Sequence, residues 1–132
     1  MPAKPVLPKP TEAELELLRV LWERGPSTVR EIHDAVGEER DTGYTTTLKI
    51  LQKMAAKGLV RRDESQRSHV YSAAIKAEQT QRQLVRDLLH RAFGGSAAQL
   101  VVQALSEQRA SAAELTEIRR LLDDMENPGR KR

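Results

Sequence analysis

Three amphipathic helical patterns followed at once by two strand-like runs fill the first half of this chain, and this order constrains the fold most. The helical patterns cover 11–24, 28–37 and 43–57. Two short strand-like runs, 59–62 and 68–72, follow and are separated by polar residues typical of a turn. The sequence therefore predicts three helices and a β-hairpin, which is the plan of a winged helix-turn-helix domain.

Local signals set most of the expected helix ends. Thr11-Glu-Ala-Glu14 and Thr28-Val-Arg-Glu31 are capping boxes, in which a Thr hydroxyl and a Glu three residues later bond each other's backbone amides. Gly25-Pro26 stops the first helix, Gly37 is expected to end the second, and Gly58 ends the third.

The second half of the chain returns to helical patterning from Lys76 onward. A fourth helix is expected up to Phe93, where Gly94-Gly95 interrupts it. Ser96-Ala-Ala-Gln99 and Ser111-Ala-Ala-Glu114 then begin a fifth and a sixth helix. The predicted fold class is mainly α: a winged helix-turn-helix (three helices plus a β-hairpin wing) followed by C-terminal helices.

We expect four segments along the chain. They are a Pro/Lys-rich flexible arm over 1–10, the winged helix domain over 11–75, a helical region over 76–126 and a basic tail over 127–132. The chain has no Cys, which excludes disulfides and thiolate metal sites. No apolar run reaches the roughly 20 residues of a membrane span, and the arm lacks the apolar core of a signal peptide. A cytoplasmic location is expected.

Positive charge is concentrated in residues 42–76, which carry seven Lys or Arg against two Asp or Glu, whereas residues 1–41 carry six against nine. The third helix, 43–57, opens with a run of Thr that lowers helix propensity, which indicates that these side chains serve a contact. A helix fits the major groove of DNA, and a basic hairpin can reach the phosphates. The residues expected to contact DNA are Tyr44, Thr45, Thr46, Lys49, Gln52 and Lys53 on the helix, and Arg62, Gln66, Arg67 and His69 on the hairpin.

The same residues give little support to an enzyme. His33, His69 and His90 are scattered without metal-ligand spacing, and there is no Gly-rich phosphate loop. We therefore expect no catalytic residues, no metal and no cofactor. The alternative that stays open is a winged helix used for protein–protein contact, although such modules tend to lack a cationic third helix.

Five segments carry a resemblance to a known family: Thr11-Glu-Ala-Glu-Leu-Glu-Leu-Leu-Arg-Val-Leu-Trp22, Thr28-Val-Arg-Glu-Ile32, Gly43-Tyr-Thr-Thr-Thr-Leu-Lys-Ile-Leu-Gln-Lys-Met54, Lys57-Gly-Leu-Val60 and Arg67-Ser-His-Val-Tyr71. In these segments the chain resembles the penicillinase-repressor family (BlaI/MecI, with the copper-responsive CopY relatives). The resemblance implies a homodimeric transcriptional repressor that binds a pseudo-palindromic operator. Its two recognition helices would enter major grooves ~34 Å, or a multiple of it, apart.

The resemblance also implies that the C-terminal helices form the dimer. Their apolar stripes exceed what one small domain can bury, although an intramolecular helical subdomain is the alternative. The candidate dimer residues are Leu84, Leu88, Leu89, Phe93, Leu100, Val101, Leu105, Leu115, Ile118 and Leu122.

Family members differ in the signal that releases them from DNA. In the penicillinase branch a membrane sensor metalloprotease triggers cleavage in the dimerisation segment, and residues 94–100 align roughly with that region. The Asn-Phe bond cut in the best-known members is absent here, so the sequence does not predict this route. The copper-sensing branch uses C-terminal cysteines, which this chain lacks. The inducing signal is left open.

Overall fold

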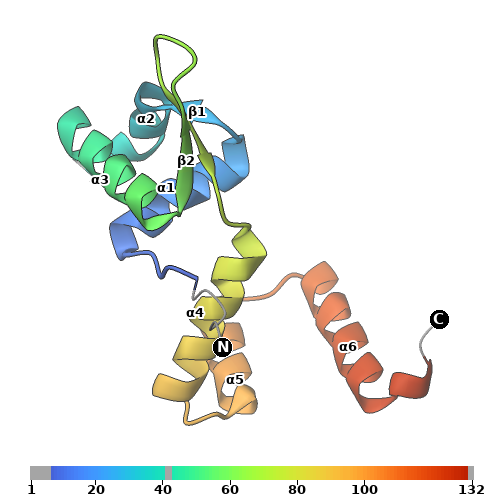
Figure 1. The fold of residues 1–132 in the computed structure, drawn as a ribbon. Helices are drawn as coiled ribbons and strands as arrows, with labels where there is room; N and C mark the ends of the chain where they lie inside the picture. The colour runs from blue at the N-terminus through green and yellow to red at the C-terminus, as the bar shows by residue number, and fades with distance from the viewer. Residues whose placement is uncertain (1–6, 41–42, 131–132) are drawn as a thin grey trace, which may run out of the picture. The chain divides into compact units, whose positions relative to one another are not determined.

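The structure is a computed structural model that describes residues 7–40 and 43–130 (Figure 1). It divides into two compact units, the first ending at Arg86 and the second beginning at Asp87, within the helix α4. The expected domain boundary at 75/76 lies before α4, whereas the first unit includes the first part of that helix. The elements in chain order are α1 Glu12–Arg24, β1 Ser27–Thr28, α2 Val29–Arg40, α3 Tyr44–Lys57, β2 Val60–Asp63, β3 Val70–Ala73, α4 Ala77–Arg91, α5 Ala97–Glu107, α6 Ala112–Glu126 and the 3₁₀ turn η1 Pro128–Arg130.

Both predicted capping boxes of the first unit are present. At α1 the Thr11 backbone N–H donates to Glu14 Oε1 over 2.8 Å, and the Glu14 N–H donates to Thr11 Oγ1 over 3.2 Å. Thr28 and Glu31 repeat the same pair of bonds at the start of α2, with the same two distances. Since each box satisfies two otherwise unpaired N–H groups, a four-residue motif sets where these helices begin.

The expected end of α2 was wrong. Gly37 lies inside the helix, which continues to Arg40. A glycine costs only about 1 kcal/mol in a helix interior relative to alanine, and the Glu-Glu-Arg sequence that follows favours a helix. The rest of the expected polar connection, residues 41–42, lies outside the described residues.

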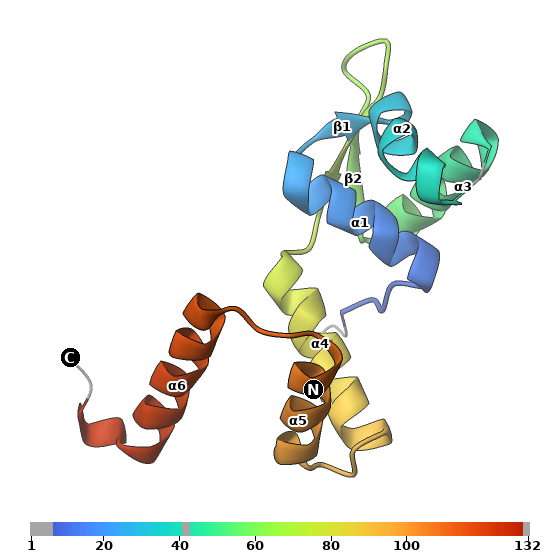
Figure 2. The same ribbon diagram turned by 180° about the vertical axis from the view of Figure 1, so that it is seen from behind.

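The predicted hairpin is present, with β2 and β3 paired antiparallel so that Arg62 lies opposite Tyr71. A third strand, β1, was not predicted. It pairs with the other side of β3, placing Ser27 opposite Tyr71, and gives the sheet order β1-β3-β2. The helices α1, α2 and α3 pack against one another beside this sheet (Figures 1 and 2). The first unit is therefore a winged helix-turn-helix, with the β2–β3 loop as its wing.

The core of the first unit lies between the three helices and the sheet. Trp22 at its edge donates from indole Nε1 to the carbonyl of Ile75 over 2.8 Å, which ties α1 to the segment after β3. Leu7, in the described part of the predicted arm, is also hydrogen-bonded within this unit. Gln83 Nε2 donates to the Leu7 carbonyl over 2.8 Å. The buried apolar side chains are Leu17, Leu18, Leu21, Val29, Ile32, Val36, Leu51, Met54, Leu59, Val60, Tyr71 and Ile75.

The second unit holds the end of α4, α5, α6 and η1. Ser96 and Ser111 cap α5 and α6 as predicted, the latter with a full capping box to Glu114. The break at Gly94-Gly95 is also as predicted, and both glycines have positive φ. No described residue of α5 or α6 is buried. These helices are therefore amphipathic segments whose apolar sides are largely open.

Candidate nucleic-acid interface

The helix α3 separates its side chains into a core face and an outward face. Thr47, Leu51 and Met54 are buried against the rest of the first unit. The helical side chains that the sequence predicts for DNA contact are all exposed: Tyr44, Thr45, Thr46, Lys49, Gln52 and Lys53. The same helix thus anchors itself to the domain with one side and presents hydroxyl, amide and ammonium groups on the other.

The ends of α3 suit a helix that presents its first turns outward. Gly43 is the N-cap and makes no side-chain cap bond, and the first turn contains no acid. At the other end Gly58 has φ 86°, and the Leu59 N–H donates to the carbonyl of Met54 over 2.9 Å. This left-handed cap turns the chain sharply into β2, so the hairpin follows the helix directly.

A cluster of side chains joins α2 to the first turn of α3. The guanidinium carbon of Arg30 lies 4.8 Å from the centroid of the Tyr44 ring. The His33 ring meets the same tyrosine edge-on, with centroids 5.8 Å apart and planes at 79°. His33 Nδ1 is hydrogen-bonded to the hydroxyl of buried Thr47 over 2.9 Å. Sequence reasoning missed Arg30, because helical periodicity gives no distance between side chains of different helices.

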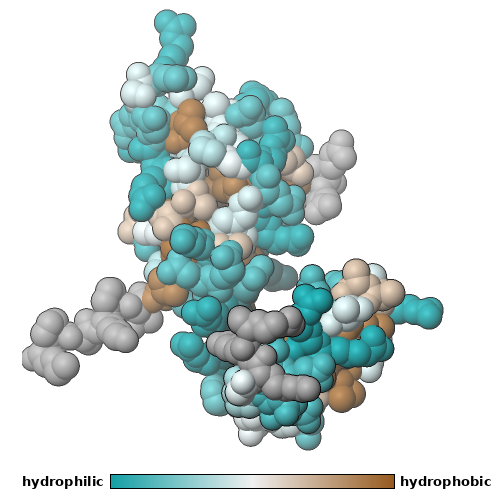
Figure 3. All heavy atoms as spheres, turned by 90° about the vertical axis from the view of Figure 1, so that its right-hand side faces the viewer, coloured by the Kyte–Doolittle hydropathy of each residue, from teal (hydrophilic) through white to brown (hydrophobic). Residues whose placement is uncertain are grey.

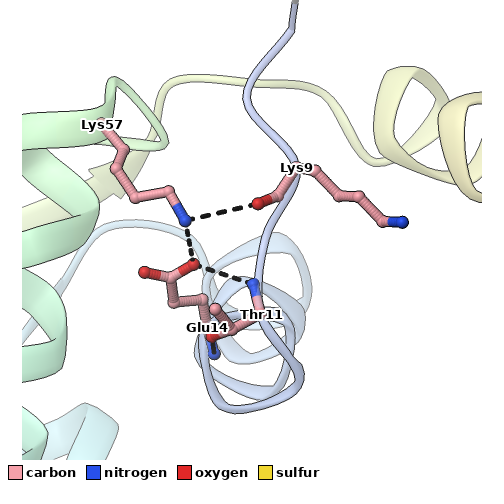
Figure 4. A network of polar contacts seen from close by, with 4 residues as sticks. All are labelled: Lys9, Thr11, Glu14 and Lys57. Atoms are coloured by element: carbon pink, nitrogen blue, oxygen red, sulfur yellow. Dashed lines mark hydrogen bonds and ion pairs between the residues drawn. The ribbon is translucent and has the colours of Figure 1, made fainter.

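A second network holds the opposite end of α3. Lys57 Nζ lies 2.6 Å from Glu14 Oε1, on the first turn of α1, and also donates to the Lys9 carbonyl over 3.3 Å (Figure 4). Glu14 is buried, with 4% of its surface exposed. Burial alone would raise the pKa of the Glu14 carboxyl, but the bonds from Lys57 and Thr11 outweigh it and lower that pKa. This contact, 43 residues apart in sequence, fixes the last turn of α3 to α1.

The wing between β2 and β3 is exposed along its whole length, residues 64–69. Arg67 and His69 lie on it and Arg62 lies just before it, as predicted. Arg62 is paired with Glu64 over 2.5 Å, so part of its charge is neutralised locally. Asp63 Oδ1 accepts from the Ser65 N–H over 2.9 Å, and this bond lowers the pKa of the Asp63 carboxyl. The wing therefore presents Arg67 and His69 beside an internally paired turn.

Among the side chains that the structure describes, those of 7–37 and 43–129, no three from His, Cys, Asp or Glu come together as ligands for a metal ion. In that part of the chain, no helix combines the length and apolar character needed to cross a membrane.

Comparisons with known proteins point to one family. The penicillinase repressor family model matches residues 10–124. The chain is 32% identical, over 87% of its length and 83% of the relative, to the transcriptional regulator BlaI of Mycobacterium tuberculosis. It is 20% identical, over 86% of its length, to the penicillinase repressor of Staphylococcus aureus. The solution structure of the DNA-binding domain of the repressor BlaI superposes with a TM-score of 0.50 at 22% identity, covering 55% of this chain and 88% of that one. This last likeness confirms the fold.

Proposed function

The chain belongs to the penicillinase repressor family and is a DNA-binding transcriptional repressor, and we propose that it acts as a homodimer on a pseudo-palindromic operator. The observation that carries the contact with operator DNA is the outward face of α3, where Thr45, Thr46 and Lys49 are exposed while the opposite face is core. A repressor that reads operator DNA works in the cytoplasm.

We propose that the outward face of α3 lies in the major groove. A threonine offers a hydroxyl for a phosphate or base and a methyl for contact with thymine, and a lysine can bond guanine or a phosphate. Gln52 can pair with both exposed edge atoms of an adenine. Each base contact of this kind contributes about 1–3 kcal/mol of discrimination against a wrong base. Tyr44 and Lys53 complete the proposed face at its two ends.

The wing supplies contacts of a different kind. Arg67 and His69 are exposed on a loop and can approach the phosphate backbone beside the groove, while Arg62 would first have to exchange Glu64 for a phosphate. Phosphate contacts carry no base information, so the wing would set register and affinity more than sequence preference.

Open apolar surface in the C-terminal helices supports the homodimer. Leu88 and Val101 are each 47% exposed and Leu122 is 52% exposed, and Figure 3 shows apolar side chains lying open on the surface. Apolar groups left exposed in a group mark an interaction site, and a symmetric pair buries the same patch on both copies. We assign this role to the residues Leu84, Leu88, Leu89, Phe93, Leu100, Val101, Leu105, Leu115, Ile118 and Leu122.

Footprinting of DNA upstream of the protein's own coding sequence would supply the operator, and gel shifts with Lys49→Ala and Thr46→Ala test the groove face. We expect each variant to weaken operator binding by roughly 5-fold or more, in line with about 1–3 kcal/mol per base contact, and to remain dimeric by sedimentation. Arg19→Ala is the matched control and should keep wild-type affinity, since Arg19 is an exposed cation of α1 that lies beside α4 and is not part of the proposed face of α3. Wild-type affinity in both α3 variants would refute the assigned face.

A single apolar-to-acidic change tests the dimer. Leu122→Glu should sediment as a monomer and lose the advantage of the full operator over a half-site, while its affinity for an isolated half-site stays at the wild-type value. Glu117→Gln, an exposed change on the same helix, should alter neither measurement. A Leu122→Glu chain that stays dimeric, or that keeps full-operator affinity as a monomer, would contradict the proposal.

A further inference from the structure

We infer that Arg30, on α2, is a phosphate-binding residue of the DNA interface and that Tyr44 holds its guanidinium in place. The inference rests on the proposed function and extends it to α2, a helix for which no DNA contact was predicted. It starts from the cluster formed by Arg30, His33, Tyr44 and Thr47 between α2 and the first turn of α3.

The cluster is built outward from the core. Thr47 is 2% exposed and its hydroxyl is hydrogen-bonded to His33 Nδ1 over 2.9 Å. That bond fixes the imidazole, whose ring meets Tyr44 edge-on at 5.8 Å. Tyr44 in turn carries Arg30 above its ring at 4.8 Å, well within the distance of about 6 Å at which a cation is attracted to an aromatic face. A buried threonine thus orients an exposed arginine through two intervening rings.

The arrangement leaves the arginine ready to bind an anion. A contact with an aromatic ring uses none of the guanidinium N–H groups as donors to an anion, and a guanidinium can donate two of them to two phosphate oxygens at once. Among the residues whose side chains the structure describes, 7–37 and 43–129, no carboxylate lies within ion-pair distance of Arg30. Its charge is therefore not neutralised locally, in contrast to that of Arg62, which pairs with Glu64.

The position of Arg30 fits a backbone contact and not a base contact. Tyr44 is the first residue of α3 and is followed directly by Thr45 and Thr46 of the proposed groove face. In helix-turn-helix proteins the helix that precedes the recognition helix crosses the DNA backbone while the recognition helix lies in the groove. A cation held on α2 beside the start of α3 would therefore meet the phosphates that border the groove.

Binding of the full chain to operator DNA, measured over a series of salt concentrations, tests the inference. Arg30→Ala should weaken binding several-fold on all sequences and reduce the slope of log affinity against log salt by about 0.9 per protomer. Arg24→Ala, an exposed cation at the end of α1, is the matched control and should keep the wild-type slope. An Arg30→Ala variant with wild-type slope and affinity would overturn the inference.

A double-mutant cycle tests the part played by Tyr44. Tyr44→Phe keeps the ring and should preserve the effect of Arg30→Ala. Tyr44→Leu removes the ring, so Arg30→Ala should cost less in that background. Strictly additive losses would refute the supporting role of the tyrosine. Lys49→Ala is measured in parallel. If Lys49→Ala weakens operator binding and Arg30→Ala does not, only this inference fails. If neither variant weakens operator binding, the proposed function is refuted as well.

Discussion

Replacing Glu14 by glutamine should destabilise the first unit, because it removes one charge from a pair that joins α1 to α3. Glutamine keeps an oxygen that can accept from the Thr11 N–H, so the capping bond survives and the change isolates the pairing with Lys57. We expect the pair to stabilise the first unit, since Lys57 Nζ and Glu14 Oε1 lie 2.6 Å apart and the Glu14 side chain is 5% exposed.

The expected cost lies between two limits. An exposed ion pair contributes about 0–1 kcal/mol, and breaking a fully buried one costs about 3–5 kcal/mol. The Lys57 side chain is 36% exposed, so its ammonium stays partly hydrated when its partner is lost. We therefore expect Glu14→Gln to lower the free energy of unfolding by about 2 kcal/mol, close to the value of a hydrogen bond to a charged group.

Urea unfolding followed by tryptophan fluorescence measures the free energy of unfolding of the first unit, because Trp22 is the sole tryptophan and lies in that unit. Protein concentration must be held fixed, since dimerisation also contributes to stability. Glu12→Gln makes the same chemical change at an exposed position of the same helix turn and should stay within about 0.5 kcal/mol of the wild type.

The pH dependence gives a second check. The folded pKa of Glu14 is lowered relative to the unfolded chain. The contribution of the Glu14 carboxylate to the free energy of unfolding is therefore fully present above the unfolded pKa of about 4.3. This contribution is lost as pH falls through the folded pKa. The stability difference between wild type and Glu14→Gln should be constant from neutral pH to about 5 and shrink at lower pH. A variant as stable as Glu12→Gln, or a difference unchanged at pH 3, would refute this reasoning.

Three further changes probe the scaffold of the first unit, each by thermal unfolding followed by circular dichroism. Leu51→Ala, at a position with no exposed surface, should cost about 2–5 kcal/mol because it leaves a cavity beneath α3; a loss below about 0.5 kcal/mol would contradict its place in the core. Gly58→Ala forces a Cβ into a left-handed backbone with φ 86° and should cost about 1–2 kcal/mol, whereas no loss would mean that the cap is not needed. Trp22→Phe removes the bond to the Ile75 carbonyl and should cost about 1 kcal/mol, and unchanged stability would show that bond to be without net effect.

Features set by neighbouring residues could be predicted from the sequence. The capping boxes at Thr11, Thr28 and Ser111 depend on a spacing of three residues, and each is present. The strand β1 was missed because two residues carry no periodicity and their pairing depends on Tyr71, which is distant in sequence. Gly37 was misjudged because a glycine that ends one helix is tolerated inside another, and the flanking residues decide.

In the candidate site, too, the features set by neighbouring residues were predictable and those set by packing between helices were not. The outward face of α3 followed from helical periodicity and from the left-handed stop at Gly58, both of which are local. The contacts of Arg30 with Tyr44 and of Glu14 with Lys57 depend on how α2 and α1 pack against α3. No pattern within a single helix encodes those distances, so the residues that orient the predicted face became visible only in the folded chain.

The central claim is that α3 presents its cationic face to a phosphate-lined groove, and a salt titration of operator binding by the wild-type chain tests it most directly. Between about 50 and 200 mM salt, log affinity should fall linearly with log salt, with a slope of about −0.9 for each phosphate neutralised and several phosphates neutralised in all. An affinity that hardly changes over this range would contradict the account and favour a winged helix used for contact with another protein.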